Sequence, residues 1–150
     1  MDPREACALL DRLNRDAAWI ALRFALRYRA IEAERPNVKS RYGVCYADGR
    51  IRIRLRHAAT GRSLKYSSLV NTLCHELAHL RHFNHGPRFK VFYLRLLDFA
   101  RVEGIYQPGP LASVAAEVRS ALGVARAAAP KRPTAPADEA AAAPLQLELF

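Results

Sequence analysis

The chain has 150 residues, enough for one domain with a real core, and a formal net charge of +10 at pH 7. Its three cysteines are an odd, widely spaced set without a Cys-x-x-Cys pair, which argues against a disulfide framework and indicates reduced thiols in a cytoplasmic protein. No signal peptide is recognisable and no apolar run approaches the roughly 20 residues of a membrane span, so we expect no membrane partner.

The positive charge is concentrated in residues 1–123, which hold 21 Lys and Arg against 11 Asp and Glu, whereas the remainder is neutral. A surplus of this size on a small body attracts polyanions, and nucleic acid is the first candidate. We therefore expect DNA as a sequence-independent partner and a nucleoid-associated place in the cytoplasm. The alternative is a basic surface that is merely solvated.

The first element is predicted to be helical. Asp2 suits the N-cap position, Pro3 suits the first helical position, and Glu5 follows three residues after the cap. Apolar residues then recur at helical spacing to about Ala33. This pattern predicts one long helix, or two helices with a break near residues 14–16.

From Val38 the apolar spacing is typical of strands. Two predicted strands, 38–46 and 50–56, flank Asp48-Gly49, which is a strong hairpin signal. In the second strand, apolar residues on one face alternate with arginines on the other. These arginines are Arg50, Arg52, Arg54 and Arg56. We expect the row to lie in solvent, where it either contacts a phosphate backbone or serves as a generic solubilising face.

Four of the five histidines fall between residues 75 and 85, and two of them form a His-Glu-x-x-His pattern. An apolar stripe at helical spacing precedes and overlaps this pattern, which predicts a helix. His75 and His79 would lie on one face of that helix, opposite the stripe, and could hold one metal ion while facing a cleft or solvent. Glu76 is turned about a quarter of the way round, where it can act as a general base without becoming a ligand.

A catalytic zinc ion needs three protein ligands and one open position. His82 and His85 compete for the third place. His82 would stay on the metal face of an unbroken helix, but Asn84, Gly86 and Pro87 are expected to end the helix there. A ligand that follows such a break can approach from the side and complete a tetrahedron, so we favour His85. His82 is then expected beside the metal ligands or near the substrate.

The sequence His75-Glu76-Leu77-Ala78-His79, followed by His85-Gly86-Pro87-Arg88-Phe89, resembles the SprT-like zinc metallopeptidases. In that family the His-Gly-Pro-x-Phe segment carries the third ligand and opens the next helix. Residues 41–92 also resemble the related YgjP-like metal-dependent hydrolases, in which a strand like Arg41-Tyr42-Gly43-Val44-Cys45 precedes the metal helix. These resemblances imply that His75, His79 and His85 bind one catalytic Zn²⁺ and that Glu76 is catalytic.

The expected fold class is α+β, as a small zincin-like domain. It would contain one or two N-terminal helices, a β-hairpin or small antiparallel sheet, the metal helix and the helices that follow. After Gly86-Pro87 a helix is predicted to about Glu103, then a turn, then a weaker helix from Pro110 to Leu122. These elements make up a predicted domain of residues 1–123. Residues 124–144 are rich in Ala and Pro and are predicted to be a disordered linker.

Residues 145–150 form the most hydrophobic short segment of the chain. Gln146-Leu147-Glu148-Leu149-Phe150 resembles the pentapeptide with which bacterial replication and repair proteins bind the sliding clamp. The resemblance implies that Gln146, Leu147, Leu149 and Phe150 contact the clamp, and a linker of this kind would raise the local concentration of the domain. The alternative is that the segment folds back on its own domain.

Together these features favour a zinc endopeptidase that cuts DNA-bound or DNA-crosslinked proteins and is recruited to replication and repair sites by its C-terminal motif. Crosslink repair is implied by the resemblance and the C-terminal motif rather than by the metal chemistry. One alternative is a YgjP-like metal-dependent hydrolase of a small molecule, such as a phosphorylated one. Another is a non-catalytic, metal-stabilised adaptor for DNA or the clamp, which Glu76 argues against because an adaptor needs no general base.

Overall fold

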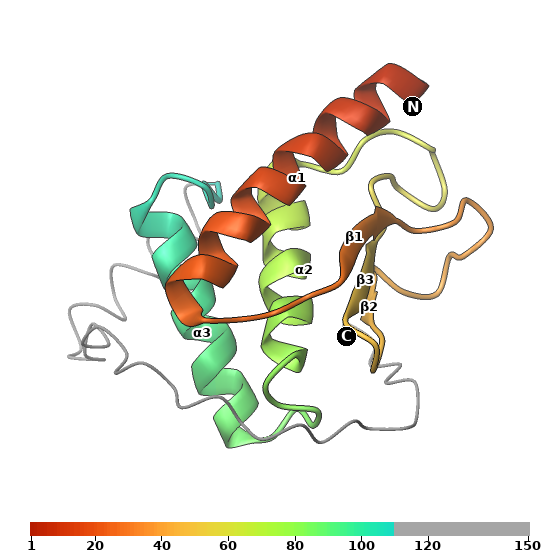
Figure 1. Ribbon diagram of the computed structural model, residues 1–150. Helices are drawn as coiled ribbons and strands as arrows, with labels where there is room; N and C mark the ends of the chain where they lie inside the picture. The colour runs from red at the N-terminus through yellow and green to blue at the C-terminus, as the bar shows by residue number, and fades with distance from the viewer. Residues whose placement is uncertain (110–150) are drawn as a thin grey trace.

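The computed structural model describes residues 1–109, which form an α+β fold (Figure 1). Its elements are, in chain order, α1 (Pro3–Phe24), β1 (Ala30–Ala33), β2 (Gly43–Cys45), β3 (Arg50–Ile53), α2 (Tyr66–His79) and α3 (Pro87–Val102). Within this part of the chain, no helix combines the length and apolar character that crossing a membrane requires. The predicted helix at 110–122, the linker at 124–144 and the motif at 145–150 lie outside the described residues.

The first helix begins as predicted and ends earlier. The Asp2 side chain accepts a hydrogen bond from the backbone N–H of Arg4 at 3.1 Å, which caps α1 in the expected way. The helix continues without a break to Phe24 and ends at Ala25, whose φ of 53° is left-handed. The prediction of helix as far as Ala33 was therefore wrong, because Ala30–Ala33 forms a strand instead.

The sheet is mixed rather than antiparallel. Its strand order is β1-β3-β2, with β3 in the centre. The predicted hairpin is confirmed, since β2 and β3 are antiparallel and Gly49 occupies the turn with a φ of 86°. β1, which the sequence did not reveal as a strand, pairs with β3 in parallel, with Ile31 opposite Ile51. This parallel pair corrects the expectation of a purely antiparallel sheet.

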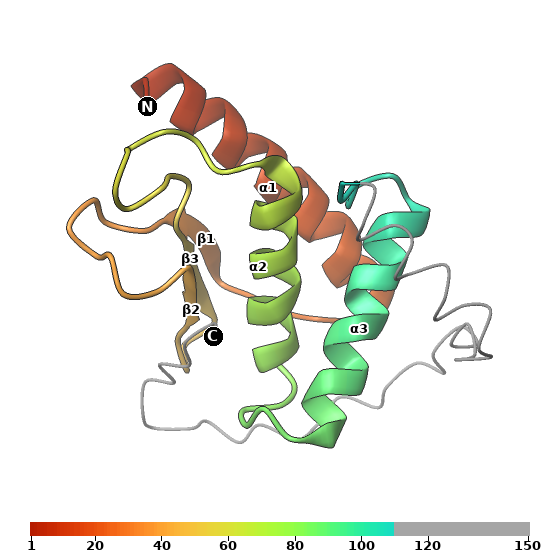
Figure 2. The same cartoon turned by 180° about the vertical axis from the view of Figure 1, so that it is seen from behind.

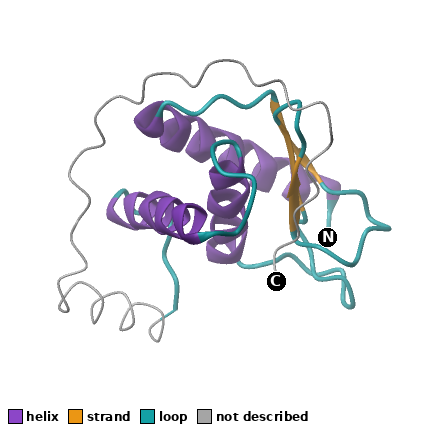
Figure 3. Cartoon of the chain, turned by 90° about the horizontal axis from the view of Figure 1, so that it is seen from below, coloured by secondary structure: helices purple, strands orange, loops and turns teal. Residues whose placement is uncertain are grey.

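The helix α2, which carries His75 and His79, lies between the sheet and α3, and α1 packs across α2 and α3 (Figures 1 and 2). Seen from below, the sheet stands on one side of the helices (Figure 3). Because α2 is covered by these neighbours, every residue from Thr72 to His79 is buried. Of the two surroundings expected for the face of His75 and His79, a cleft or solvent, direct exposure to solvent is excluded, since both side chains have no exposed surface.

Candidate metal centre

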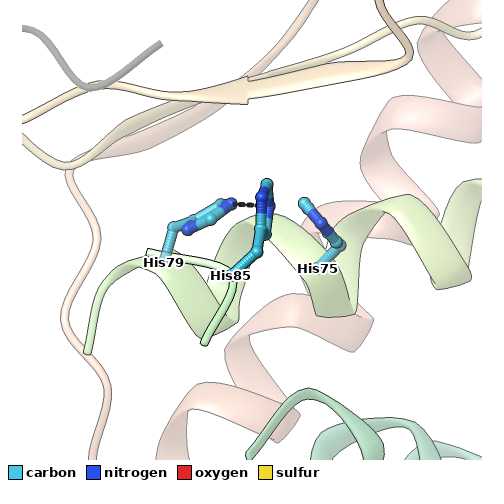
Figure 4. Close-up of side chains that lie close together, drawn as sticks. All are labelled: His75, His79 and His85. Atoms are coloured by element: carbon cyan, nitrogen blue, oxygen red, sulfur yellow. Dashed lines mark hydrogen bonds between the residues drawn. The ribbon is translucent and has the colours of Figure 1, made fainter. Parts of the chain in front are cut away.

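Three histidine side chains converge at the C-terminal end of α2 (Figure 4). His75 and His79 come from α2, His85 comes from the segment before α3, and one ring nitrogen of each lies within 4.8 Å of the others. The Nε2 atoms of His79 and His85 are 3.1 Å apart. Two nitrogens bound to tetrahedral zinc at about 2.0–2.1 Å would stand roughly 3.4 Å apart. The three imidazoles could therefore hold a metal ion, and the separation of His79 Nε2 from His85 Nε2 is close to that expected for two ligands of one ion.

The break after α2 brings His85 to the cluster from the side. α2 ends at His79, and α3 begins at Pro87 after an N-cap at Gly86. His82 contributes through its backbone, because its carbonyl oxygen lies 3.1 Å from His79 Nδ1. A donated hydrogen bond from Nδ1 to this carbonyl leaves His79 Nε2 as the atom that faces the other histidines. The His82 ring itself packs on Phe92, at 5.7 Å between ring centroids.

Aromatic side chains of α3 hold the imidazole rings in place. Phe89 is buried and its ring centroid lies 4.9 Å from His75, 4.5 Å from His79 and 4.8 Å from His85. Tyr93, one turn later, packs edge-on against His75 at 5.6 Å, and its hydroxyl donates a hydrogen bond to Asn71. Burial lowers the pKa of both His75 and His79 to about 4, so these imidazoles are neutral at pH 7, as metal ligation requires.

Glu76 is fully buried beside the histidine cluster. Its Oε1 lies 3.4 Å from His75 Nδ1. Neither carboxylate oxygen has a hydrogen-bond partner within residues 1–109. Burial raises the pKa of Glu76 well above its usual value, and the positive charge of Arg41 opposes this rise. Burying a carboxyl group in this way costs free energy, and such groups are concentrated at functional sites.

Sequence reasoning missed two contributors to this site. The His82 carbonyl cannot be identified from residue type, since every residue has a backbone carbonyl. Gly43 was noted only as part of the motif Arg41-Tyr42-Gly43-Val44-Cys45, yet it lies against Glu76 and Thr72 of α2. The signal for Gly43 was a glycine inside a predicted strand, which often marks a close approach of backbone to another group.

Of the four arginines in the predicted row, the two that lie in β3 are paired with carboxylates. The Nε atom of Arg50 lies 2.7 Å from an Asp48 carboxylate oxygen, and Nε of Arg52 lies 3.1 Å from one of Glu32. Glu32 belongs to β1, the strand that sequence reasoning missed. The charge of these two arginines is therefore balanced by neighbouring residues of the sheet.

The other two β3-region arginines differ from each other. Arg54 is only 7% exposed, donates a hydrogen bond to the Lys39 carbonyl at 2.9 Å and stacks on the Tyr42 ring at 4.1 Å. Arg56 is half-buried. The prediction of a solvent-exposed row of four arginines was thus wrong for Arg54, because its guanidinium is held inside the fold.

The chain is similar in sequence to one protein family and in fold to solved structures of one protein. The sequence pattern of the WLM domain family matches residues 1–140. Among solved structures, Wss1 from Saccharomyces cerevisiae is similar, with 17% identity and a TM-score of 0.63, over 67% of this chain and 80% of that chain. A structure of a Wss1 mutant from the same organism shows 16% identity and a TM-score of 0.63. That match covers 70% of this chain and 87% of the mutant chain. The comparison with curated proteins returned no match. At these identities, the likeness to Wss1 establishes a shared fold.

Proposed function

Because this chain belongs to the WLM domain family, which is metalloprotease-like, we propose that it is a zinc-dependent endopeptidase that cuts proteins bound or crosslinked to DNA. The observation that carries the proposal is the convergence of His75, His79 and His85 beside the buried carboxyl group of Glu76. Glu76 is not one of the three converging ligands, so its carboxyl group is available as a general base beside them.

The roles of the site residues follow from their positions. His75, His79 and His85 would hold Zn²⁺, which when bound supplies a Lewis acid that lowers the pKa of water and polarises the scissile carbonyl. The positive charge of bound Zn²⁺ would favour the ionised form of Glu76 and so oppose the effect of burial on its pKa. Ionised Glu76 would take the proton of the attacking water and pass it to the leaving amine. The His82 carbonyl fixes the tautomer of His79, and Phe89 holds the three imidazoles and excludes bulk water.

The proposed substrate class rests on the family and on charge. The WLM domain and the Wss1-like fold support a protease of DNA–protein crosslinks. The net charge of +10 supports sequence-independent affinity for DNA, which would bring the enzyme to proteins held there. The proposed site of action is accordingly the nucleoid in the cytoplasm. Recruitment by the sliding clamp through Gln146, Leu147, Leu149 and Phe150 is part of the proposal and rests on the sequence alone.

The test is to incubate the full-length protein with zinc and a protein substrate bound to DNA. Wild type is compared with Glu76→Gln, which keeps the shape of the side chain and removes the base. Glu103→Gln, at the C-terminal end of α3, is a matched control that changes an exposed carboxylate instead. Fragments from wild type and Glu103→Gln, and none from Glu76→Gln, support the proposal. Equal cleavage by all three proteins would show that the reaction does not require the Glu76 carboxylate.

A further inference from the structure

A groove of about 410 Å³ lies along the N-terminal half of α3 and the segment that precedes it, which includes His82. Three arginines and one histidine line it, and no acidic residue does. These residues, which we call the basic groove, are Arg81, His82, Arg88 and Arg95. Val91 and Phe92 contribute apolar surface between them.

The basic groove is organised by Phe92, which is 3% exposed. The Arg81 guanidinium stacks over the Phe92 ring at 4.4 Å and donates a hydrogen bond to the Phe24 carbonyl at 2.7 Å. The His82 ring packs edge-on against the same Phe92. Because these contacts hold Arg81 and His82 in fixed positions, a ligand would not have to immobilise them on binding.

The positive charge of the basic groove is not balanced by the protein. Within residues 1–109, no carboxylate forms an ion pair with Arg81, Arg88 or Arg95. In the same part of the chain, the Nε atom of Arg95 is buried without a hydrogen-bond partner. This distinguishes the groove from β3, where Asp48 and Glu32 balance two of the arginines. Clustered like charges repel one another, and a bound anion relieves that repulsion.

We propose that the basic groove binds a phosphate group of a nucleic-acid backbone, an inference that rests on the proposed function. Guanidinium groups match the geometry of phosphate oxygens, and an open groove admits a continuous polymer. The position of the groove is consistent with this role. His82 lines the groove, and its carbonyl oxygen lies within hydrogen-bond distance of His79 Nδ1. His82 therefore connects the groove to the segment that brings His85 to the histidine cluster.

The test uses the full-length protein and a fluorescent single-stranded DNA oligonucleotide, with affinity measured at several salt concentrations. Arg88→Glu/Arg95→Glu should weaken binding at least about tenfold and reduce the slope of log affinity against log salt by about 1 to 2. Arg4→Glu/Arg15→Glu changes the charge equally on the exposed surface of α1 and should have a much smaller effect. Equal losses in the two double variants would overturn the proposal, since net charge alone would then explain binding.

Other arms of the experiment identify the ligand. Arg88→Gln/Arg95→Gln should show a smaller loss in the same direction, and thermal unfolding verifies that each variant is folded. Competition by inorganic phosphate at concentrations that leave ionic strength unchanged would overturn the assignment to a nucleic-acid backbone in favour of free phosphate. Binding of a polyglutamate peptide as tight as that of the oligonucleotide would overturn it in favour of an acidic protein segment.

Cleavage of an unfolded protein substrate without DNA separates this inference from the proposed function. Arg88→Glu/Arg95→Glu should cleave that substrate like wild type and lose DNA binding. If the wild type shows no cleavage and the double variant binds DNA more weakly than the wild type, the basic groove stands and the peptidase proposal fails. If the double variant binds DNA like wild type while cleavage depends on Glu76, the groove fails and the peptidase proposal stands.

Discussion

Gly43 of β2 lies directly against Glu76 of α2. A Cβ atom at position 43 would come within 2.8 Å of Glu76 Oε1 and within 2.7 Å of Thr72 Cγ2. Both distances are shorter than a Cβ atom can approach without displacing its neighbours. The absence of a side chain at this position therefore allows β2 to cover the carboxyl group and to hold it beside His75.

Gly43→Ala is expected to lower kcat at least about tenfold, because displacing a catalytic group by about 1 Å can reduce the rate about 100-fold. The added methyl group should also cost about 1–3 kcal/mol of stability through overpacking. Val44→Ala, in the same strand, is the control, since Val44 is buried and its truncation destabilises the fold by leaving a cavity. Steady-state kinetics and urea unfolding are measured on both variants. A fully active Gly43→Ala protein would contradict this account of the strand.

Glu34 and Arg41 form an ion pair in the interior, with 2.8 Å between Arg41 Nε and Glu34 Oε2. The Glu34 side chain is fully buried and that of Arg41 is 12% exposed. Glu34→Ala leaves the guanidinium without its partner and should destabilise the protein by about 3–5 kcal/mol. Asp98→Ala removes the exposed partner of Arg101 and should cost no more than about 1 kcal/mol. Equally small changes in the free energy of unfolding would show that the Glu34–Arg41 pair is not isolated from water.

The three cysteines should differ sharply in reactivity. Cys7 is exposed, whereas Cys45 and Cys74 are buried. Burial raises the pKa of Cys45 to about 12 and also raises the pKa of Cys74, so neither forms the reactive thiolate at pH 8. Mass spectrometry of the native protein after alkylation at pH 8 should show one modified thiol, and Cys7→Ser should show none. A second modified thiol in the native protein would mean that the sheet or α2 opens readily.

Deletion of residues 145–150 is expected to abolish capture by a bacterial sliding clamp in a pull-down assay. Replacement of Leu149 and Phe150 by alanine should have the same effect, because these apolar side chains would supply most of the contact area. Cleavage of an isolated protein substrate should be unchanged in both variants. Retained capture by the clamp after the deletion would remove recruitment from the proposed function.

The grouping of the three histidines could be predicted from sequence because it depends on local spacing. The interval between His75 and His79 fixes their common face on a helix, and Gly86-Pro87 marks the break after which His85 returns. The turn at Asp48-Gly49 and the extent of α3 are likewise local features, and the structure agrees with both. Local chain preferences were sufficient for each of these elements.

The surroundings of the site could not be predicted because they depend on contacts distant in sequence. The end of α1 at Ala25 uses a left-handed residue that is not glycine, so no helix-stop signal is visible there. β1 was consequently missed, and with it Glu32, which balances the charge of Arg52 from the neighbouring strand. The basic groove likewise forms only when α3 packs beside the segment that follows α2.

Zinc K-edge X-ray absorption on the full-length protein, loaded with one equivalent of zinc, tests the central claim most directly. Three histidine nitrogens at about 2.0–2.1 Å are predicted for wild type, and two for His85→Ala, which should also bind zinc more weakly. A sulfur ligand at about 2.3 Å, an unchanged spectrum for His85→Ala, or wild-type protein that holds no stoichiometric zinc would contradict the proposed centre.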